Sequence, residues 1–325
     1  MRSELFQLPP VPWARHQTRT SGSLPMMAEP YSGPDGVRTA IKTAAKTRAK
    51  QTGESVSSLI SAAHFDRFLS RVFSDGESPF VVIGGMSMLA RFSGARTTTD
   101  IDLDQAEGAI EHAVVDLISR AQTDLGDHFR FVHEGTDYAA EADQRHGLQS
   151  AKVRFQVYLG VTAQGKVSVD LGVRKRPTLP VTPWTPDFRL ALPRLETRSY
   201  SILALEDQMA DKLAAMHDTY GDGQPSSRTK DLVDLAVIAL QGAPNPVELR
   251  SAIIAEFSRR GIPLPKVMSI PSGWAAAYGK LSRDVAPLRD HRRLDQGVDL
   301  VENLINPVLA ATAVGTWDRE MQRWI

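Results

Sequence analysis

The most regular stretch of the chain covers residues 80–103, where three patterns follow one another. Residues 80–83 are all apolar and predict a buried strand. Gly84-Gly85 follows directly, and residues 86–92 have the period of a short helix. Residues 100–103 then alternate between acidic and apolar, as a half-buried strand does. The expected order is strand, glycine turn, helix and strand, with two acidic residues at the end.

Periodicity predicts several further elements on both sides of this stretch. Helices are expected at residues 37–49, 56–73 and 109–121, and strands at residues 129–133, 151–159 and 166–171. The later part of the chain is dominated by helical patterns, at residues 201–216, 226–240, 247–257, 273–281, 297–305 and 316–325. The fold class is therefore α/β, with a mixed sheet and its helices followed by a helical C-terminal half.

Composition and charge narrow the class of protein. The chain has 325 residues with 38 basic and 38 acidic side chains, so any contact with nucleic acid would come from a local patch. It has no cysteine, which excludes disulfides and thiolate metal sites and fits a cytoplasmic location. No apolar run approaches the roughly 20 residues that cross a bilayer, so no contact with a membrane is expected.

The central stretch contains candidate chemistry. Asp100 and Asp102 point to the same side of their strand, and two carboxylates this close repel each other unless a cation lies between them. Mg²⁺ is commonly held in this way, together with substrate phosphates. Gly84 and Gly85 open the following helix, where backbone N–H groups can bind phosphate, and the hydroxyl of Ser87 can add to them. The alternative is a solvated strand face and an ordinary turn.

Two charged residues within apolar surroundings are further candidates. Asp170 lies between apolar residues near the end of a predicted strand, where an acid can simply be exposed at the strand end. Lys212 lies in the mostly apolar helix at residues 201–216, where it either points to an anion or extends to solvent.

Two basic segments can be interpreted in two ways. Residues 173–200 interleave Arg and Lys with Trp184 and Phe188, a composition that suits single-stranded RNA but also an ordinary linker. The basic helix at residues 37–49 is either a phosphate-contacting surface or a solvated helix face.

The motifs together resemble the first, second and third motifs of the AbiEii-type nucleotidyltransferase toxins. This family, which includes the mycobacterial MenT toxins, belongs to the DNA polymerase β-like nucleotidyltransferase superfamily. The matching residues are Arg96, Thr98, Asp100 and Asp102 after the glycine pair, Lys212 in Ala-Asp-Lys-Leu, and Arg228, Lys230, Asp231 and Asp234 in Arg-x-Lys-Asp-x-x-Asp-Leu. The resemblance covers roughly residues 37–320.

The resemblance implies a role for each of these residues. Asp100 and Asp102 would bind Mg²⁺ and, with Lys212, Asp231 and the third acid Asp170, form the catalytic set. Gly84, Gly85, Ser87, Arg96, Thr98, Arg228 and Lys230 would bind the nucleotide. The implied reaction transfers nucleotides from a nucleoside triphosphate (NTP) to the 3′ end of tRNA and so blocks translation. A cognate antitoxin protein would be the partner.

The resemblance also suggests three parts of the chain. Residues 1–36 would be a flexible tail, residues 37–200 the nucleotidyltransferase core with its N-terminal helices, and residues 201–325 a helical domain that completes the cleft. Two other functions fit the same motifs: transfer to a small molecule such as an aminoglycoside or to a protein hydroxyl, and nucleotide binding without catalysis. The preferred NTP, the acceptor and the action of the antitoxin are open at this stage.

Overall fold

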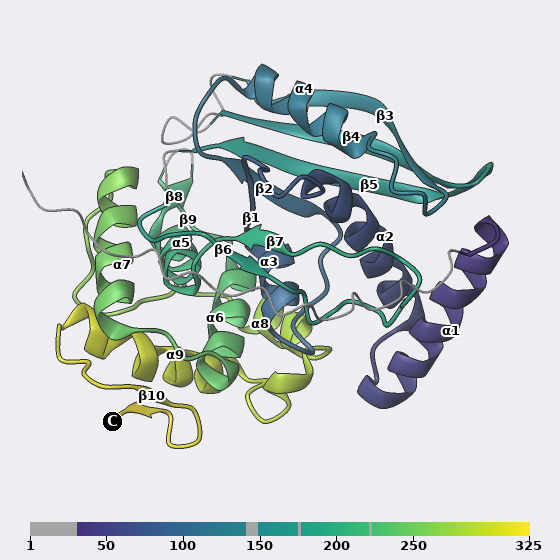
Figure 1. Ribbon diagram of the computed structural model, residues 1–325. Coiled ribbons are helices and arrows are strands. Elements are labelled where there is room, and N and C mark those ends of the chain that lie inside the picture. Colours follow the sequence, from purple (N-terminus) through teal and green to yellow (C-terminus); the bar gives the residue numbers. More distant parts are fainter. Residues whose placement is uncertain (1–30, 141–148, 175–176, 221–222) are drawn as a thin grey trace, which may run out of the picture.

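A computed structural model describes residues 31–140, 149–174, 177–220 and 223–325 (Figure 1). Its centre is a seven-stranded sheet in the order β3-β4-β5-β2-β1-β7-β6. The strands are β1 Phe80–Val82, β2 Ile101–Gln105, β3 Phe129–Tyr138, β4 Gln149–Leu159, β5 Thr162–Val173, β6 Thr182–Trp184 and β7 Tyr200–Ile202. Since β2 is antiparallel to β1 but parallel to β5, the sheet is mixed, as the sequence predicts.

The first half of the chain contains four helices, α1 Pro34–Thr52, α2 Val56–Val72, α3 Gly84–Arg91 and α4 Ile110–Ala121. Helices α2, α3 and α4 lie on one face of the sheet, and α1 packs mainly on α2. Helix α2 begins after Ser55, whose hydroxyl accepts a hydrogen bond from the N–H of Ser58 at 3.2 Å, an ordinary N-cap. Phe68 of α2 then packs its ring on Phe131 and Phe155 of the sheet, at centroid distances of 5.2 and 5.0 Å.

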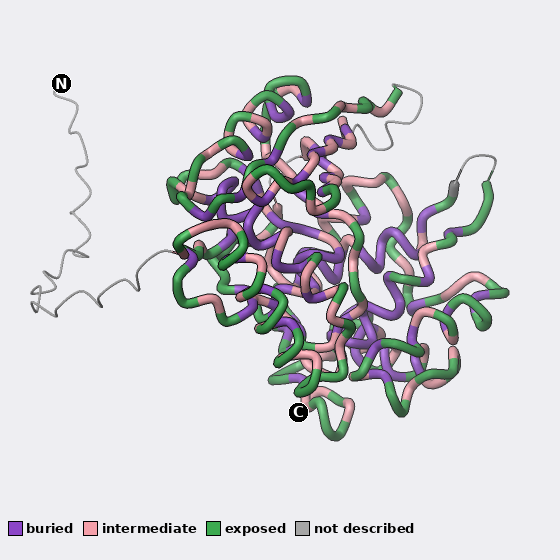
Figure 2. The backbone as a smooth tube through the Cα atoms, turned by 90° about the vertical axis from the view of Figure 1, so that its right-hand side faces the viewer, coloured by how far each residue is buried: buried purple, intermediate pink, exposed green. Residues whose placement is uncertain are grey.

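The second half of the chain is helical. Its elements are α5 Leu205–His217, α6 Thr229–Gln241, α7 Pro246–Arg260, α8 Ala275–Ser282 and α9 Leu294–Leu309, with the short strand pairs β8 Thr219–Tyr220 with β9 Gln224–Pro225 and β10 Trp317–Asp318 with β11 Arg323–Trp324. Helix α6 is buried along most of its length, because α5, α8 and α9 all pack against it. The backbone in Figure 2 shows buried segments running through the interior of both halves.

The buried apolar residues form two clusters. The first consists of buried apolar residues between Val37 and Ile202, and it fills the space between the sheet and α1, α2 and α4. The second joins α5 to α9, and it also includes Met88 of α3 and Phe92, which directly follows α3. Helix α3 therefore belongs to both halves of the structure, and it carries the glycine turn at its N-terminal end.

Some predicted elements are wrong in type or in extent. The helix expected at residues 201–216 begins only at Leu205, because Tyr200–Ile202 forms β7 beside β1. The helix expected at residues 316–325 is a hairpin of β10 and β11, in which the indole of Trp317 donates to the carbonyl of Ala239 at 2.7 Å. The structure places α1 from Pro34, within the range expected to be tail, while residues 1–30 lie outside the described part.

None of the helices in the described part of the chain is long and apolar enough to cross a membrane.

Candidate active site

Asp102 on β2 and Asp170 on β5 lie directly opposite each other in the parallel register of the two strands. The same row continues onto β4, where Lys152 is opposite Asp170. The ammonium of Lys152 lies 3.0 Å from a carboxylate oxygen of Asp170 and 3.5 Å from one of Asp100. The structure thus brings the three predicted acids to one side of the sheet, around one cation that the sequence analysis did not identify.

The donor set of these acids suits a hard cation. Burial raises the pKa of Asp102, the N–H of Gly85 opposes this rise, and the negative charge of Asp170 adds to it. A cation at this position favours the ionised carboxylates. Within the described ranges, no three His, Cys, Asp or Glu side chains are already gathered as a metal site. The Lys152 ammonium nevertheless shows that Asp100 and Asp170 can share a positive charge.

The glycine turn is shaped around Asp102. The N–H of Gly85 donates to a carboxylate oxygen of Asp102 at 3.0 Å. Gly84 has a φ of 58°, and a Cβ built on it would lie 2.4 Å from the same carboxylate. A Cβ on Gly85 would lie 3.1 Å from the hydroxyl of Thr98, which itself donates to the carbonyl of Asp100 at 3.1 Å. Both glycines are therefore needed for the close approach of the turn to the acidic strand.

Ser87 lies inside the protein rather than at the expected phosphate site. Its side chain is fully buried, and its hydroxyl donates to the amide oxygen of Gln208 on α5 at 2.8 Å. The amide nitrogen of Gln208 donates in turn to the carbonyl of Gly84 at 2.8 Å. The sequence-based assignment of Ser87 to phosphate binding is thus corrected: Ser87 and Gln208 join α3 to α5 and hold the glycine turn.

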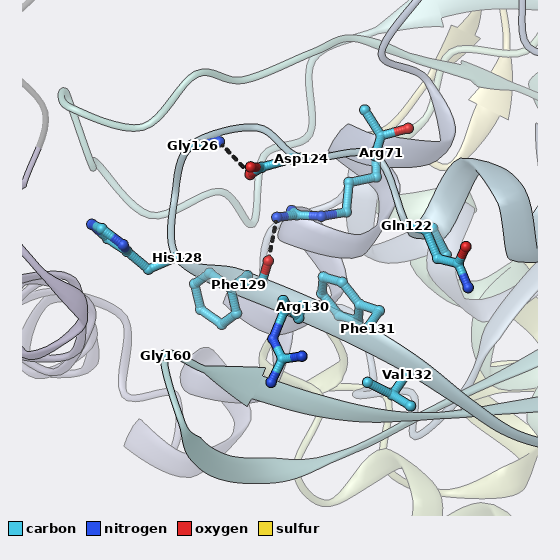
Figure 3. Close-up of a pocket in the computed structure, with 12 residues that line it drawn as sticks. Arg71, Gln122, Asp124, Gly126, His128, Phe129, Arg130, Phe131, Val132 and Gly160 are labelled. Carbon is cyan, nitrogen blue, oxygen red and sulfur yellow. Dashed lines mark hydrogen bonds between the residues drawn. The ribbon is translucent and has the colours of Figure 1, made fainter.

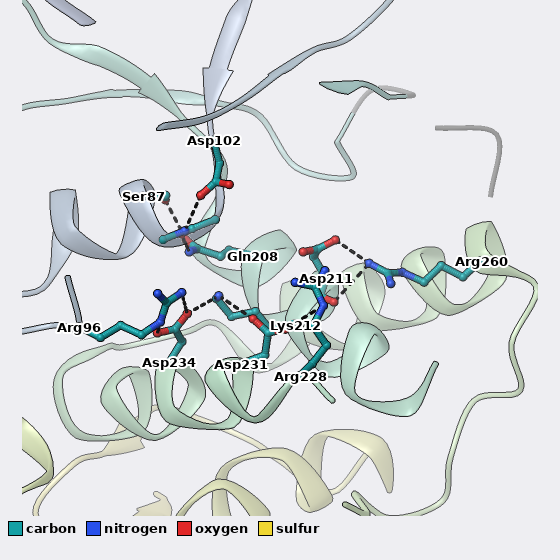
Figure 4. A network of polar contacts seen from close by, with 12 residues as sticks. Ser87, Arg96, Asp102, Gln208, Asp211, Lys212, Arg228, Asp231, Asp234 and Arg260 are labelled. Carbon is teal, nitrogen blue, oxygen red and sulfur yellow. Dashed lines mark hydrogen bonds and ion pairs between the residues drawn. The ribbon is translucent and has the colours of Figure 1, made fainter. Parts of the chain in front are cut away.

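Lys212 on α5 is buried against two acids of α6 (Figure 4). Its ammonium lies 2.6 Å from Asp234 and 3.2 Å from Asp231. Asp234 also accepts two hydrogen bonds from Arg96, at 2.9 and 3.1 Å. Burial alone would lower the pKa of Lys212, but the two carboxylates outweigh this effect and raise it. Lys212 does point to an anion, and these anions belong to the third motif.

This cluster brings the three motifs together. Arg96 comes from the segment after α3, Lys212 from α5, and Asp231 and Asp234 from α6. The sequence analysis identified Arg96 as a nucleotide ligand, but its guanidinium is held by Asp234. Arg228 lies beside the cluster, with its Nε 3.7 Å from Asp231, and Lys230 is exposed at the start of α6. The cluster thus has a buried part and an exposed basic rim.

A cavity of about 700 Å³ lies on the same side of the sheet, between β2 and helices α5 and α7. Asp104, two residues after Asp102, contacts Arg174 at 2.8 Å, and Arg174 contacts Asp211 of α5 at 2.9 Å. Arg260 of α7 completes this series with a contact of 2.7 Å to Asp211. These ion pairs connect β2, which carries Asp102, to the helical half beside the candidate acids.

The basic segment at residues 173–200 is anchored to the protein at a few positions, while more than half of its described residues are exposed. Phe188 is buried, and Arg189 contacts Asp66 of α2 at 2.8 Å. The indole of Trp184 donates to the carbonyl of Ala90 at 3.0 Å. Residues 175 and 176 lie outside the described part of the chain. Trp184 and Arg194 stay exposed, so the RNA-binding and linker interpretations of this segment both remain predictions.

Another cavity, of about 660 Å³, lies at the outer strand β3 and is shown in Figure 3. Arg71 and Arg130 are among its lining residues, and none of the residues identified from the motifs lines it. The candidate acids lie elsewhere, on β5, on β2 and just before β2, and β4 separates these strands from β3.

A sequence model of the family described as "Nucleotidyl transferase AbiEii toxin, Type IV TA system" matches residues 67–308, which include every candidate site residue predicted from the motifs. The chain belongs to the AbiEii nucleotidyltransferase toxin family. AbiEii proteins are toxins of type IV toxin–antitoxin systems, so a nucleotide substrate and an antitoxin partner follow from membership. The family expected from the motifs and the mixed α/β fold are both confirmed.

Two solved structures are similar to this AbiEii chain at low sequence identity. The first is MenT4, the nucleotidyltransferase toxin Rv2826c from Mycobacterium tuberculosis H37Rv, with 17% identity over 83% of this chain and 98% of MenT4, and a TM-score of 0.48. The second is JHP933 from Helicobacter pylori, with 15% identity over 81% of this chain and 94% of JHP933, and a TM-score of 0.39. The comparison with curated proteins found no significant match.

Proposed function

We propose that this AbiEii protein transfers nucleotides from an NTP to the 3′ end of tRNA and so blocks translation. The observation that supports a transfer reaction best is the row formed by Asp102 and Asp170 beside the Gly84-Gly85 turn. It combines an acidic site for a cation with a helix start for phosphate. The tRNA acceptor is supported by the motifs that this chain shares with its family.

Asp100 and Asp102 would hold Mg²⁺, which neutralises the charge of the triphosphate and of the departing pyrophosphate. Basic side chains of the protein would bind the triphosphate itself. Arg228 and Lys230 would contact the triphosphate from the exposed rim of the α6 start, where Lys230 is exposed. Lys212, which is buried between Asp231 and Asp234, would add its positive charge to the electrostatic potential at the triphosphate.

The transfer step requires an activated acceptor hydroxyl. Asp170 is half-exposed on β5 and is aligned with Asp102, so it would accept the proton of the acceptor hydroxyl. The hydroxyl oxygen then bonds to the α-phosphorus, the bond from this phosphorus to the bridging oxygen breaks, and pyrophosphate leaves with the bond electrons. Asp231 would keep the ammonium of Lys212 in place during this step.

The proposal is tested by incubating the purified protein with total tRNA, Mg²⁺ and each labelled NTP in turn. We expect label on tRNA with the wild type, on the order of 10³-fold less with Asp102→Asn, and an unchanged level with Asp299→Asn, an exposed acid on α9. Omission of Mg²⁺ should abolish labelling. Label on a small molecule or a protein instead would reassign the acceptor, and no pyrophosphate with any NTP would leave only nucleotide binding.

A cytoplasmic location and inhibition by a cognate antitoxin complete the proposal. Expression of the wild type in a bacterial host should stop growth, whereas Asp102→Asn should not, since the acid holds the cation on which the transfer depends.

A further inference from the structure

The three-stranded part of the sheet formed by β3, β4 and β5 has one face that is open and polar. Alternate residues of β4 are buried, from Ala151 to Leu159, and pack on the helices of the first cluster. The residues between them are half-exposed, and they are Lys152, Arg154, Gln156 and Tyr158. This strict alternation makes one face of β4 a core face and the other a solvent face.

The strand register arranges the open face in four rows. The first row is Asp137, Lys152 and Asp170, and it continues to Asp102 on β2. The second row is Gly135, Arg154 and Ser168, the third is Val132, Gln156 and Lys166, and the fourth begins with Arg130 and Tyr158. The open face is therefore continuous with the catalytic acids, and its far end lies six residues along β4, or about 20 Å, from Lys152.

The charge of the open face changes with distance from the acids. Its first row is dominated by carboxylates, whereas the other three rows carry Arg130, Arg154 and Lys166 against one acid, Glu134, which contacts Lys166 at 2.8 Å. Arg154 contacts Asp137 of the first row at 2.5 Å. Exposed ion pairs of this kind are weak, so a phosphate can replace either carboxylate.

The fourth row offers a stacking platform. The guanidinium of Arg130 lies over the ring of Tyr158, 5.3 Å from its centroid. Figure 3 shows Arg130 and Val132 extending from the same side of β3. A planar guanidinium and an aromatic ring, both accessible, are the groups on which unpaired bases stack, and an open sheet can bind an unpaired strand without a groove.

We propose that the open face of β3, β4 and β5 binds the single-stranded 3′ end of the RNA acceptor and leads its terminal hydroxyl to Asp170. Phosphates contact Arg154 and Arg130, and a base stacks on Tyr158. The RNA chain runs along the open face toward the first row, where its terminal hydroxyl reaches Asp170 and Asp102. This inference rests on the proposed transfer to RNA.

Three variants test the inference. Arg130→Ala/Arg154→Ala removes two cations of the open face, and Tyr158→Ala removes its ring. Arg283→Ala/Arg289→Ala removes two exposed arginines between α8 and α9 and is the charge-matched control. Binding of a short single-stranded RNA labelled at its 5′ end is measured by fluorescence anisotropy over a range of salt. Binding of a fluorescent NTP with Mg²⁺ is measured in parallel.

The expected result is specific to the open face. Each phosphate contact contributes about 0.7 to the salt slope of single-strand binding, so Arg130→Ala/Arg154→Ala should lower the slope by about 1.4. Tyr158→Ala should weaken RNA binding at least about fivefold at every salt concentration. The control should leave both quantities unchanged, and all three variants should bind the fluorescent NTP as the wild type does.

A measurement on the wild type removes any dependence on the folding of variants. RNA with a 4-thiouridine near its 3′ end is crosslinked by light, and mass spectrometry locates the crosslink, which we expect on β4 or β3. If the wild type labels RNA but the crosslinks lie elsewhere and the variants bind RNA normally, the proposed role of the open face is wrong while the proposed function stands. Absence of both RNA labelling and RNA binding in the wild type would overturn the proposed function as well.

Discussion

The carboxylate of Asp102 fills the space that a side chain on Gly84 would need. A Cβ on Gly84 would lie 2.4 Å from this carboxylate, and the φ of 58° also disfavours any L-residue. The glycine turn and the acidic strand are thus fitted to each other before any substrate binds. This contact explains why a turn of two glycines precedes the helix.

Gly84→Ala should reduce nucleotidyl transfer on the order of 10²-fold, because the new methyl group displaces the carboxylate of Asp102, on which the proposed reaction depends. Gly76→Ala is the matched control, since Gly76 has a φ of 75° but no atom within 4 Å of its added Cβ. Both variants should lose about 1 kcal/mol of unfolding free energy from the backbone alone. Equal activity in the two variants would contradict a role for the contact with Asp102.

Lys212→Met should destabilise the protein by about 3–5 kcal/mol, because it leaves Asp231 and Asp234 buried without their shared ammonium. Urea unfolding of the purified variant measures this loss. Lys280→Met, at an exposed position of α8, should change the unfolding free energy by no more than about 0.5 kcal/mol. A Lys212→Met protein as stable as the control would show that the two acids do not depend on this lysine.

Stability should fall in acid partly through Asp234. Burial raises its pKa, but Lys212 and Arg96 outweigh burial and hold it below the ordinary value. A carboxyl with a lowered folded-state pKa contributes stability above its unfolded pKa of about 3.9, and this contribution is lost as the pH falls toward the folded-state pKa. Asp234→Asn should therefore be less stable at pH 7 and should lose less on acidification below about pH 4. Thermal unfolding across this range measures both effects.

Ser87→Ala should lower stability by about 1 kcal/mol, because the buried amide oxygen of Gln208 loses its hydroxyl donor but keeps the guanidinium of Arg91 at 3.1 Å. The KM for the NTP should not change, since Ser87 has no exposed surface with which to contact phosphate. Ser61→Ala, on the exposed side of α2, is the control for the substitution itself. A raised KM with unchanged stability would restore the original assignment of Ser87 to phosphate binding.

The sequence predicted elements and site residues correctly where the pattern lies within one short segment of the chain. The apolar run before Gly84, the alternation around Asp102 and the lysine within an apolar helix all depend on near neighbours in the chain. Lys152 and Gln208 were missed, because strand register and helix packing bring them to the site and neither belongs to a motif. A lysine at a half-exposed strand position gives no signal of its own until β4 is aligned with β5.

The two elements that were predicted as helix but are strands also depend on pairing that the local pattern does not show. Residues 200–202 continue smoothly into the apolar period of α5, and only their pairing with β1 makes them a strand. The last ten residues contain Trp317 and Trp324, whose rings pack edge to face at 5.6 Å across a hairpin. A spacing of seven residues also suits one face of a helix, so that periodicity alone could not separate the two conformations.

The ion-pair cluster of Arg96, Lys212, Asp231 and Asp234 also limits how relatives of this chain can diverge. Arg96 and Asp234 are 138 positions apart, yet each supplies the buried charge that the other requires. Loss of Arg96 alone leaves the two carboxylates with one ammonium, and loss of Asp234 alone leaves two cations with one carboxylate, whereas simultaneous loss of both keeps the charges of the cluster equal. Positions 96 and 234 should therefore covary among AbiEii proteins, and they should change together with position 212 in lineages that have lost transferase activity.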